Sequence, residues 1–282
     1  MMMKLIASNS ETGEAWDLNS PWDLSIPLHH GMENPRAFSM DYPVFEPFRA
    51  GSFVGDVAQG SPCNVMGMQI SPHGNGTHTE CVGHIGYNAK GQAGHGPDTC
   101  LKVHTALAQF WFPVQLVSVT PVLKENDPSQ LWITHIELSK LLPHNNSYAL
   151  EGLVVRTLPN ESSKLTKDYS ETSPAAFEPE ALAYLAALGI LHLLTDLPSV
   201  DPEHDQGQLL AHKAFWCVDT AIRISATITE LIYVPSNIPD GNYLLNLMLP
   251  NIALDAVPSR PVLYPTKAAH SSKADPQPII TR

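Results

Sequence analysis

The residues best suited to chemistry lie close together in one stretch, residues 71–84, which reads S-P-H-G-N-G-T-H-T-E-C-V-G-H. Four of its side chains can bind a cation or carry a proton: His73, His78, Glu80 and His84. His78 and Glu80 are two residues apart, so in an extended strand both side chains point to the same face. Imidazole and carboxylate groups are ligands of hydrolytic metal sites, although Gly- and His-rich stretches also occur as plain surface loops. This combination of residue types favours a metal site.

A framework of strands and helices is predicted around this stretch. Thr134 and Glu137 form a capping box at the start of one helix. Pro179 begins a second helix, and Gly189 follows its end. The predicted strands cover residues 114–119, 153–157 and 190–194, and the predicted helices cover residues 134–142 and 179–188. This alternation of strands and helices predicts an α/β fold.

Two earlier segments are also predicted to be strands. Residues 22–28 read W-D-L-S-I-P-L, and Pro27 confines such a strand to a sheet edge or a strand end. Residues 65–70 alternate weakly and run straight into the stretch 71–84, which predicts that the ligands lie at a strand end. The segment between them carries five aromatic residues, from Phe38 to Phe53. We expect most of these to anchor a long loop onto the core; the alternative is a pocket for a flat substrate.

The stretch 71–84 resembles the signature of the cyclase family of metal-dependent hydrolases, a family that includes bacterial kynurenine formamidase. The family pattern is H-x-G-T-H-x-D-x-P-x-H. Here residues 76–78 supply G-T-H, Glu80 takes the Asp position and His84 takes the position of the last His. Residues 23–27, D-L-S-I-P, resemble the opening motif of the same family.

Three positions depart from the family signature. Glu80 keeps the carboxylate on an arm one methylene longer than Asp, and Val82 stands where the family has proline. The first His of the signature falls on Gly74, while the nearest histidine, His73, comes one residue earlier. A degenerate site in a binding or scaffold protein is therefore an alternative to an enzyme.

A second region resembles the second signature of the family, T-D-x-P-S-x-D followed by a metal-binding His and then a Glu. Residues 195–201 read T-D-L-P-S-V-D, His212 matches the His, and Glu230, eighteen residues further on, matches the Glu. Without the resemblance, His212 reads as a histidine on a helix surface. For Asp196 and Asp201 we expect a structural role, because Asp beside Pro and Ser commonly hydrogen-bonds the turn backbone.

The resemblance implies a swivelling β/β/α fold, that is, a single α/β domain with a mixed sheet. It also implies one or two divalent ions, zinc or manganese, held by His78, Glu80, His212 and Glu230, with Glu80 able to bridge two ions. Water activated by the metal would attack a small amide, and His84 would carry the proton to the departing amine. An aryl formamide such as N-formylkynurenine is the substrate that the resemblance implies. Hydrolysis or elimination acting on another cyclic amide or ester is an alternative.

Composition narrows the class of protein and the kinds of partner. The chain has 282 residues, of which 43% are hydrophobic and 16% charged, as in a globular protein. We assign residues 1–266 to one hydrolase domain and residues 267–282, which are polar and contain proline, to a mobile tail. A formal net charge of -12 argues against binding to nucleic acid or to an anionic membrane.

Cysteine spacing and hydropathy predict the compartment. The four cysteines are scattered without paired short spacings, which favours a reducing environment. The sequence contains neither a signal-peptide pattern nor an apolar run long enough to span a bilayer. We therefore expect a cytoplasmic protein that acts on a small-molecule substrate, and we expect it to form a homo-oligomer.

Overall fold

One curled, mixed sheet of nine strands forms the framework of the protein in the computed structural model, which describes residues 6–8, 13–94, 96–125, 127–142 and 150–267. Four parallel strands lie in its centre, β9 (Trp111–Val119), β12 (Gly152–Thr157), β14 (His192–Thr195) and β15 (Thr227–Glu230), and the remaining strands extend it antiparallel on both sides. Across the sheet the order is β17 (Ala256–Pro258), β8 (His78–Cys81), β15 (Thr227–Glu230), β14 (His192–Thr195), β12 (Gly152–Thr157), β9 (Trp111–Val119), β16 (Gly241–Met248), β18 (Arg260–Pro265) and β3 (Trp22–Asp23).

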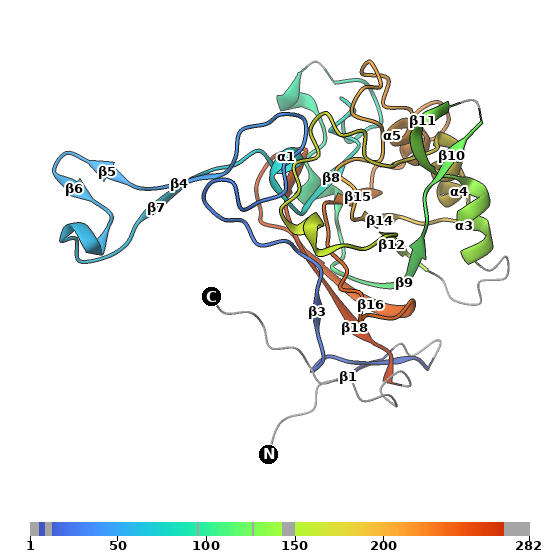
Figure 1. The fold of residues 1–282 in the computed structure, drawn as a ribbon, viewed down its shortest axis with the longest axis horizontal. Helices are drawn as coiled ribbons and strands as arrows, with labels where there is room; N and C mark the ends of the chain where they lie inside the picture. Colours follow the sequence, from blue (N-terminus) through green and yellow to red (C-terminus); the bar gives the residue numbers. More distant parts are fainter. Residues whose placement is uncertain (1–5, 9–12, 95, 126, 143–149, 268–282) are drawn as a thin grey trace.

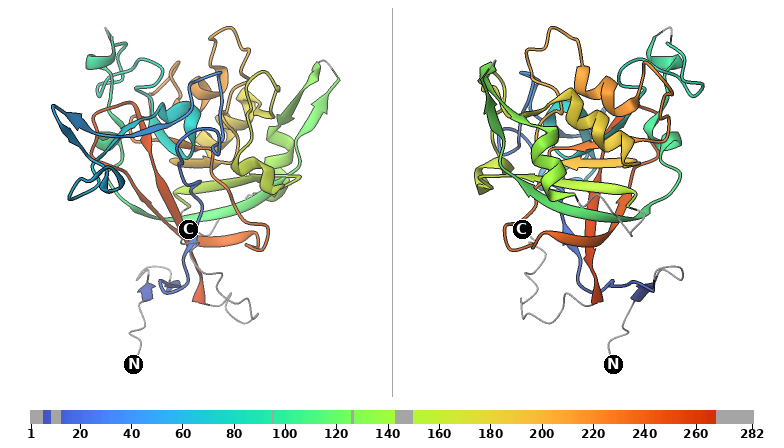
Figure 2. Two further views of the ribbon diagram at one scale, coloured as in Figure 1. Left: turned by 60° about the vertical axis from the view of Figure 1, so that its left-hand side comes forward. Right: turned by 90° about the vertical axis from the view of Figure 1, so that its right-hand side faces the viewer.

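The two faces of this sheet are covered by two separate hydrophobic clusters. Side chains alternate along each strand, so Leu153 and Val155 of β12 enter one cluster, and Val154 enters the other. The first cluster joins the sheet to three helices, α3 (His135–Leu141), α4 (Pro179–Ala187) and α5 (Leu210–Trp216), which lie together on one side of the sheet (Figure 2). The result is a single α/β domain with a mixed sheet, as predicted, and the sheet is curled.

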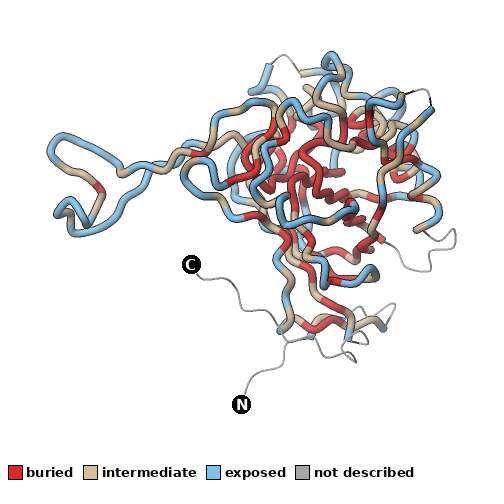
Figure 3. The backbone as a smooth tube through the Cα atoms, viewed as in Figure 1, coloured by how far each residue is buried: buried red, intermediate tan, exposed pale blue. Residues whose placement is uncertain are grey.

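A long two-stranded arm leaves this body (Figure 1). Its strands are β4 (Val44–Pro47), β5 (Arg49–Ala50), β6 (Phe53–Val54) and β7 (Met66–Gln69), and a short 3-10 helix, Val57–Gln59, lies near its tip. The surface of the arm is mostly exposed or half-buried (Figure 3). Phe45, Phe48 and Phe53 belong to it and none is buried, so the expectation that most aromatics of this segment anchor a loop onto the core is wrong.

Several shorter elements complete the described chain. They are β1 (Ile6–Ser8) and β2 (Ala15–Asp17), which pair with each other; β10 (Val122–Lys124), β11 (Asp127–Ile133) and β13 (Ala176–Phe177), which form a small sheet; α1 (Pro72–Asn75) and α2 (Val103–Ala106); and 3-10 turns at Pro97–Thr99 and Ser162–Leu165. None of the helices in the described part of the chain has the length and apolar character needed to cross a bilayer.

Most of the predicted elements are confirmed, and two need correction. Thr134 is the N-cap of α3 as predicted, since its hydroxyl accepts a hydrogen bond from the backbone N–H of Glu137; the Glu137 carboxylate bonds the Thr134 hydroxyl and does not complete the reciprocal bond of a capping box. The strand predicted over residues 22–28 shortens to the edge strand β3. The strand predicted over residues 65–70 forms as β7, but it belongs to the arm and not to the main sheet. His78 and Glu80 lie within a separate strand of the main sheet, β8, and not at the end of the predicted one. The predicted tail lies outside the described residues, apart from Lys267.

Candidate metal centre

The deepest part of the site is built by the pairing of two neighbouring strands. β8 runs antiparallel to β15 with His78 directly opposite Glu230, and His78 Nε2 lies 3.3 Å from Glu230 Oε2. Two residues along β8, Glu80 points to the same side, as the spacing predicted. Hydrogen bonds to β17 on the other edge of β8 hold this register from both sides. The side chains of His78 and Glu80 are fully buried.

A second segment brings His212 to the same place. His212 lies on α5, and its Nε2 is 3.0 Å from Glu80 Oε1 and 3.8 Å from Glu230 Oε1. Asp201 fixes the helix and the ring together: its carboxylate accepts hydrogen bonds from the backbone N–H groups of Ala211 and His212 and lies 2.5 Å from His212 Nδ1. His212 is only 2% exposed, so it is not the surface histidine that its helical position suggested.

The mouth of the site is formed by three half-buried side chains. His73 on α1 places Nδ1 3.3 Å from Glu80 Oε2. His84 follows β8 through a turn in which its N–H bonds the carbonyl of Cys81, and its Nδ1 lies 3.8 Å from Glu80 Oε2. Asp255 places Oδ2 3.1 Å from His73 Nε2 and 3.4 Å from His84 Nδ1. The floor of the site is thus buried, and its rim is partly exposed to solvent.

Close packing explains the glycines of the motif. A Cβ on Gly83 would lie 1.9 Å from the carbonyl oxygen of Leu101, so only glycine lets the chain pass there on its way to His84. A Cβ on Gly74 would lie 2.6 Å from Met40 Sδ and 3.0 Å from the carbonyl oxygen of Ala37. A side chain at position 74 would therefore require Met40 and the backbone of Ala37 to shift.

The charges of the cluster balance one another. Burial alone would raise the pKa of Glu80, but the neighbouring histidines, His84 and His212 foremost, lower it well below its usual value. Burial likewise opposes a charge on His212, but Glu80, Asp201 and Glu230 together raise the pKa of its ring well above the usual range. Burial also opposes a charge on His73, yet Asp255 and Glu80 raise its pKa to about 10. Buried carboxylates in this number need positive charge close by, from protons or from a cation.

Two observations show that these residues fit a divalent cation. His78 Nε2 and Glu80 Oε2 are buried and make no hydrogen bond within the described part of the chain. Each deep histidine also has its other ring nitrogen on an acceptor, His78 Nδ1 on the carbonyl of Gly76 at 2.9 Å and His212 Nδ1 on Asp201. Histidines that ligate metals characteristically donate their second N–H in this way. Ligand atoms of His73, His78 and Glu80 lie within 4.8 Å of one another, as do those of Glu80, His84 and His212.

Comparison with known proteins identifies the family. The family model Cyclase, described as "Putative cyclase", matches residues 22–202. The chain belongs to the cyclase family. It is 27% identical over 243 residues to a kynurenine formamidase of Paracidovorax citrulli, and this alignment covers 86% of this chain and 95% of that protein.

Two solved structures extend the likeness of this cyclase-family chain at the level of the fold. Isatin hydrolase A from Labrenzia aggregata, in a structure with benzyl benzoate bound, has a TM-score of 0.60 at 14% identity and covers 86% of this chain and 93% of its own. A predicted metal-dependent hydrolase from Bacillus stearothermophilus has a TM-score of 0.56 at 18% identity, covering 86% and 97%. Both show that the sheet and helices are arranged as in other proteins of this fold.

The structure brings together all five site residues predicted for this cyclase-family chain. Contacts of 3.0 to 3.8 Å link the buried side chains of His78, Glu80, His212 and Glu230, and the partly exposed His84 lies at the edge of this cluster. Sequence reasoning missed Asp255, which precedes a three-residue strand and lies in no motif. It also left His73 undecided, because that histidine lies one residue before the family position.

The two aspartates of the second signature hold structure around the site. Asp196 is buried and accepts hydrogen bonds from the backbone N–H and hydroxyl of Thr157 and from Lys164 Nζ at 2.8 Å. Asp201 holds His212, as described above. The structural role expected for both residues is confirmed, and for Asp201 it includes orientation of a candidate ligand.

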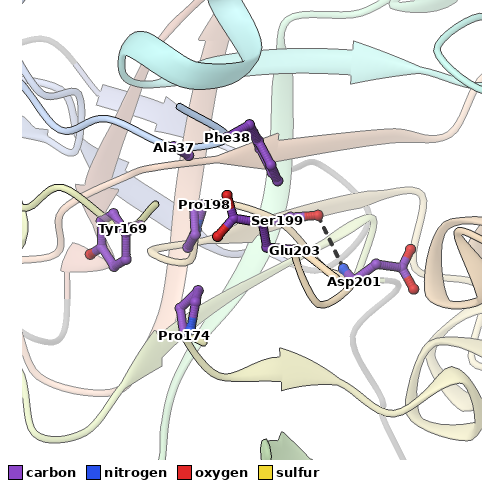
Figure 4. A pocket seen from close by; sticks show the side chains of 8 residues that line it. All are labelled: Ala37, Phe38, Tyr169, Pro174, Pro198, Ser199, Asp201 and Glu203. Carbon is purple, nitrogen blue, oxygen red and sulfur yellow. Dashed lines mark hydrogen bonds between the residues drawn. The ribbon is translucent and has the colours of Figure 1, made fainter. Parts of the chain in front are cut away.

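A small recess behind Asp201 is separate from the candidate metal centre (Figure 4). It is lined by Ala37, Phe38, Tyr169, Pro174, Pro198, Ser199, Asp201 and Glu203. Its free volume, about 10 Å³, suits about one water molecule and no organic substrate. The carboxylate of Asp201 points away from this recess in Figure 4, so the chemistry lies on the other side of Asp201.

Proposed function

We propose that the protein is a metal-dependent amide hydrolase whose ions, zinc or manganese, are held by His78, Glu80, His212 and Glu230. The observation that supports this most strongly is that two buried side-chain atoms, His78 Nε2 and Glu80 Oε2, make no hydrogen bond within the described part of the chain. His78 Nε2 faces Glu230, and the other carboxylate oxygen of Glu80 faces His212. A divalent cation bound there would supply an acidified water and polarise the substrate carbonyl. The carboxylate of Glu80 has one oxygen toward His212 and the other toward His73, which would allow it to bridge two ions.

The buried residues and the partly exposed residues of the site have different roles in the proposed reaction. The buried floor around His78 and Glu80 keeps bulk water from the reacting carbonyl. His84 has a side chain 27% exposed, so its ring can reach both the floor and an incoming substrate. Its Nδ1 faces Asp255, which leaves Nε2 as the atom that hands a proton to the departing amine.

An aryl formamide such as N-formylkynurenine is the substrate class we propose first. The likeness to a kynurenine formamidase over nearly the whole of both chains supports it, together with the hydrolytic ligand set. An aryl amine is also a better leaving group than an alkyl amine, so a proton donor at the rim suffices. The homo-oligomeric assembly and the cytoplasmic location stay predictions.

Hydrolysis of a cyclic amide is the second candidate. The fold is shared with isatin hydrolase A, named for a ring-opening reaction on a cyclic amide. The same residues would serve, because attack on a ring carbonyl needs the same polarised carbonyl and the same proton to nitrogen.

Metal analysis followed by a substrate panel tests the proposal. Purified protein is reconstituted with zinc or manganese and assayed against N-formylkynurenine, an aliphatic formamide of similar size, and isatin. We expect the aryl formamide to be hydrolysed at least about a hundredfold faster than the aliphatic one, because good positioning contributes orders of magnitude. His204→Ala, which removes an exposed histidine paired with Glu171, serves as a control with unchanged activity.

The outcomes separate the candidates. Turnover of isatin above that of the aryl formamide would replace the first substrate class by the second. Protein that binds neither zinc nor manganese would refute the hydrolase itself and favour the alternative of a degenerate site.

A further inference from the structure

Asp255 reaches the candidate metal centre from a part of the chain that carries no family signature. It ends the loop that joins β16 to β17, and its backbone carbonyl accepts a hydrogen bond from Cys81 N–H at 3.2 Å. β17 then pairs with β8, Ala256 opposite Glu80. The main chain thus fixes the Asp255 carboxylate at the rim, one residue away from the strand neighbour of Glu80.

The carboxylate of Asp255 lies on the outer nitrogen of His73. Its Oδ2 is 3.1 Å from Nε2, while Nδ1 of the same ring is 3.3 Å from Glu80 Oε2. A neutral imidazole has one nitrogen that donates and one that accepts. With a cation bound in the centre the ring would be neutral, and the acceptor at Nε2 would then hold the remaining proton there and leave the lone pair of Nδ1 available to the cation beside Glu80.

The same arrangement occurs at the two deep histidines. His212 has Asp201 on one ring nitrogen and Glu80 on the other, and His78 has the carbonyl of Gly76 on one and Glu230 on the other. At these two, Nδ1 is the outer nitrogen; at His73 it is the inner one. His73 therefore faces the centre with the opposite nitrogen from the two deep histidines, His78 and His212.

This reversal follows from the one-residue displacement in the motif. A side chain at position 74 would be crowded, because its Cβ would lie 3.0 Å from the carbonyl oxygen of Ala37 and 2.6 Å from Met40 Sδ. The imidazole comes instead from the preceding residue, on α1, and it approaches Glu80 from the rim side. A ring reaching in from there needs an anchor on its outer nitrogen to be held in one orientation.

We propose that Asp255 is a positioning residue that makes His73 a ligand of the metal centre, in place of the histidine missing at position 74. The inference rests on the proposed metal-dependent function. It assigns to Asp255 the part that Asp201 takes for His212. Removal of such a partner typically lowers metal affinity by about 10- to 100-fold, because the ligand loses its orientation and basicity.

The alternative is that Asp255 itself binds a cation. Ligand atoms of His73, His84 and Asp255 also lie within 4.8 Å of one another. The two roles predict different effects of removing Asp255. If it orients His73, its loss lowers the affinity for the metal but not the number of ions bound at saturation. If it is a ligand of a separate ion, its loss also lowers that number.

Competition with a coloured zinc chelator measures both quantities in the full-length protein. We expect Asp255→Ala to weaken zinc binding about 10- to 100-fold at unchanged saturating stoichiometry, and Asp255→Asn, which keeps an acceptor oxygen, to recover most of the affinity. His73→Ala should weaken binding similarly. Adding Asp255→Ala to His73→Ala should then change affinity no further, because the partner of Asp255 is gone.

Two controls accompany these variants. Asp41→Ala removes an equal charge from an exposed residue that contacts Asn75 through its main-chain carbonyl, and it should bind zinc as the wild type does. Urea unfolding in EDTA checks that each variant is folded.

Three results would overturn the inference. They are wild-type affinity in Asp255→Ala, loss of one equivalent of zinc at saturation in that variant, and additive losses in the double variant. If the wild type itself binds no zinc or manganese, the proposed function fails first, and that outcome is distinct from the other three.

Discussion

His192 allows the pH dependence of stability to be predicted from a single buried side chain. It begins β14, is 5% exposed, stacks on Phe112 with ring centroids 4.1 Å apart, and places Nδ1 2.9 Å from the hydroxyl of Thr227. Burial, and then the positive charge of Arg223, lower the pKa of His192 from 6.5 to about 4. The folded protein therefore keeps this ring neutral in a range where the unfolded chain protonates it.

The difference between the folded and unfolded pKa of His192 fixes the sign and the size of the change in stability with pH. Because the folded pKa lies below the unfolded value, the unfolded state binds more protons between about pH 4 and 6.5, and stability falls as pH falls through that window. The full loss, reached below about pH 4, is about 3.5 kcal/mol at about 1.4 kcal/mol for each pH unit between the two pKa values. From pH 7 to pH 5 a single site of this kind loses about 2 kcal/mol.

Urea unfolding of two variants measures this contribution. His192→Asn and His192→Leu both remove the titrating ring, and both should be less stable than the wild type at pH 7 because the contact with Phe112 is lost. Their stability should fall between pH 7 and pH 5 by about 2 kcal/mol less than that of the wild type. All measurements are made in EDTA, so that metal release does not enter. Parallel pH curves for the wild type and both variants would refute the reasoning.

Three further predictions concern the candidate site. Glu80→Ala and His212→Ala should each lose most bound zinc or manganese by elemental analysis while circular dichroism shows a folded protein; full occupancy in both would remove these residues from the ligand set. His84→Ala should keep its metal and lose about a hundredfold or more in kcat, and loss of the metal instead would make His84 a ligand. Gly83→Ala should cost at least about 2 kcal/mol in urea unfolding, because its Cβ would collide with the carbonyl of Leu101; an unchanged midpoint would contradict that packing.

Local signals account for the parts of the fold that were predictable. The N-cap Thr134, the proline that begins α4 and the β-rich strands β9 and β12 depend on signals within a few residues, so the sequence alone locates them. Alternation within residues 65–70 also predicted β7 as a strand. It could not say which sheet β7 joins, because pairing with β4 in the arm depends on a partner some twenty residues away.

Site residues could be predicted where the spacing in the sequence, or the family resemblance, indicates which side chains lie together. The two-residue separation of His78 and Glu80 fixes a common face, and the resemblance supplied His212 and Glu230. Asp255 was not predictable, because it is placed by the pairing of β17 with β8 and has no local pattern of its own. The role of His73 was left undecided, because a comparison with the family signature position by position finds Gly74 where the first histidine should be and does not count the histidine one residue earlier.

The pairing of β8 on both edges is what makes the site depend on a single register. His78 and Glu80 face the centre because His78 lies opposite Glu230 on one side, and Glu80 lies opposite Ala256, next to Asp255, on the other. A slip of one residue in β8 would turn both ligands to the other face and bring Thr79 inward. Thr79 instead bonds the hydroxyl of Thr229 at 2.8 Å on that other face. This buried pair opposes the slip, so the side of β8 that faces away from the chemistry also holds the ligands in place.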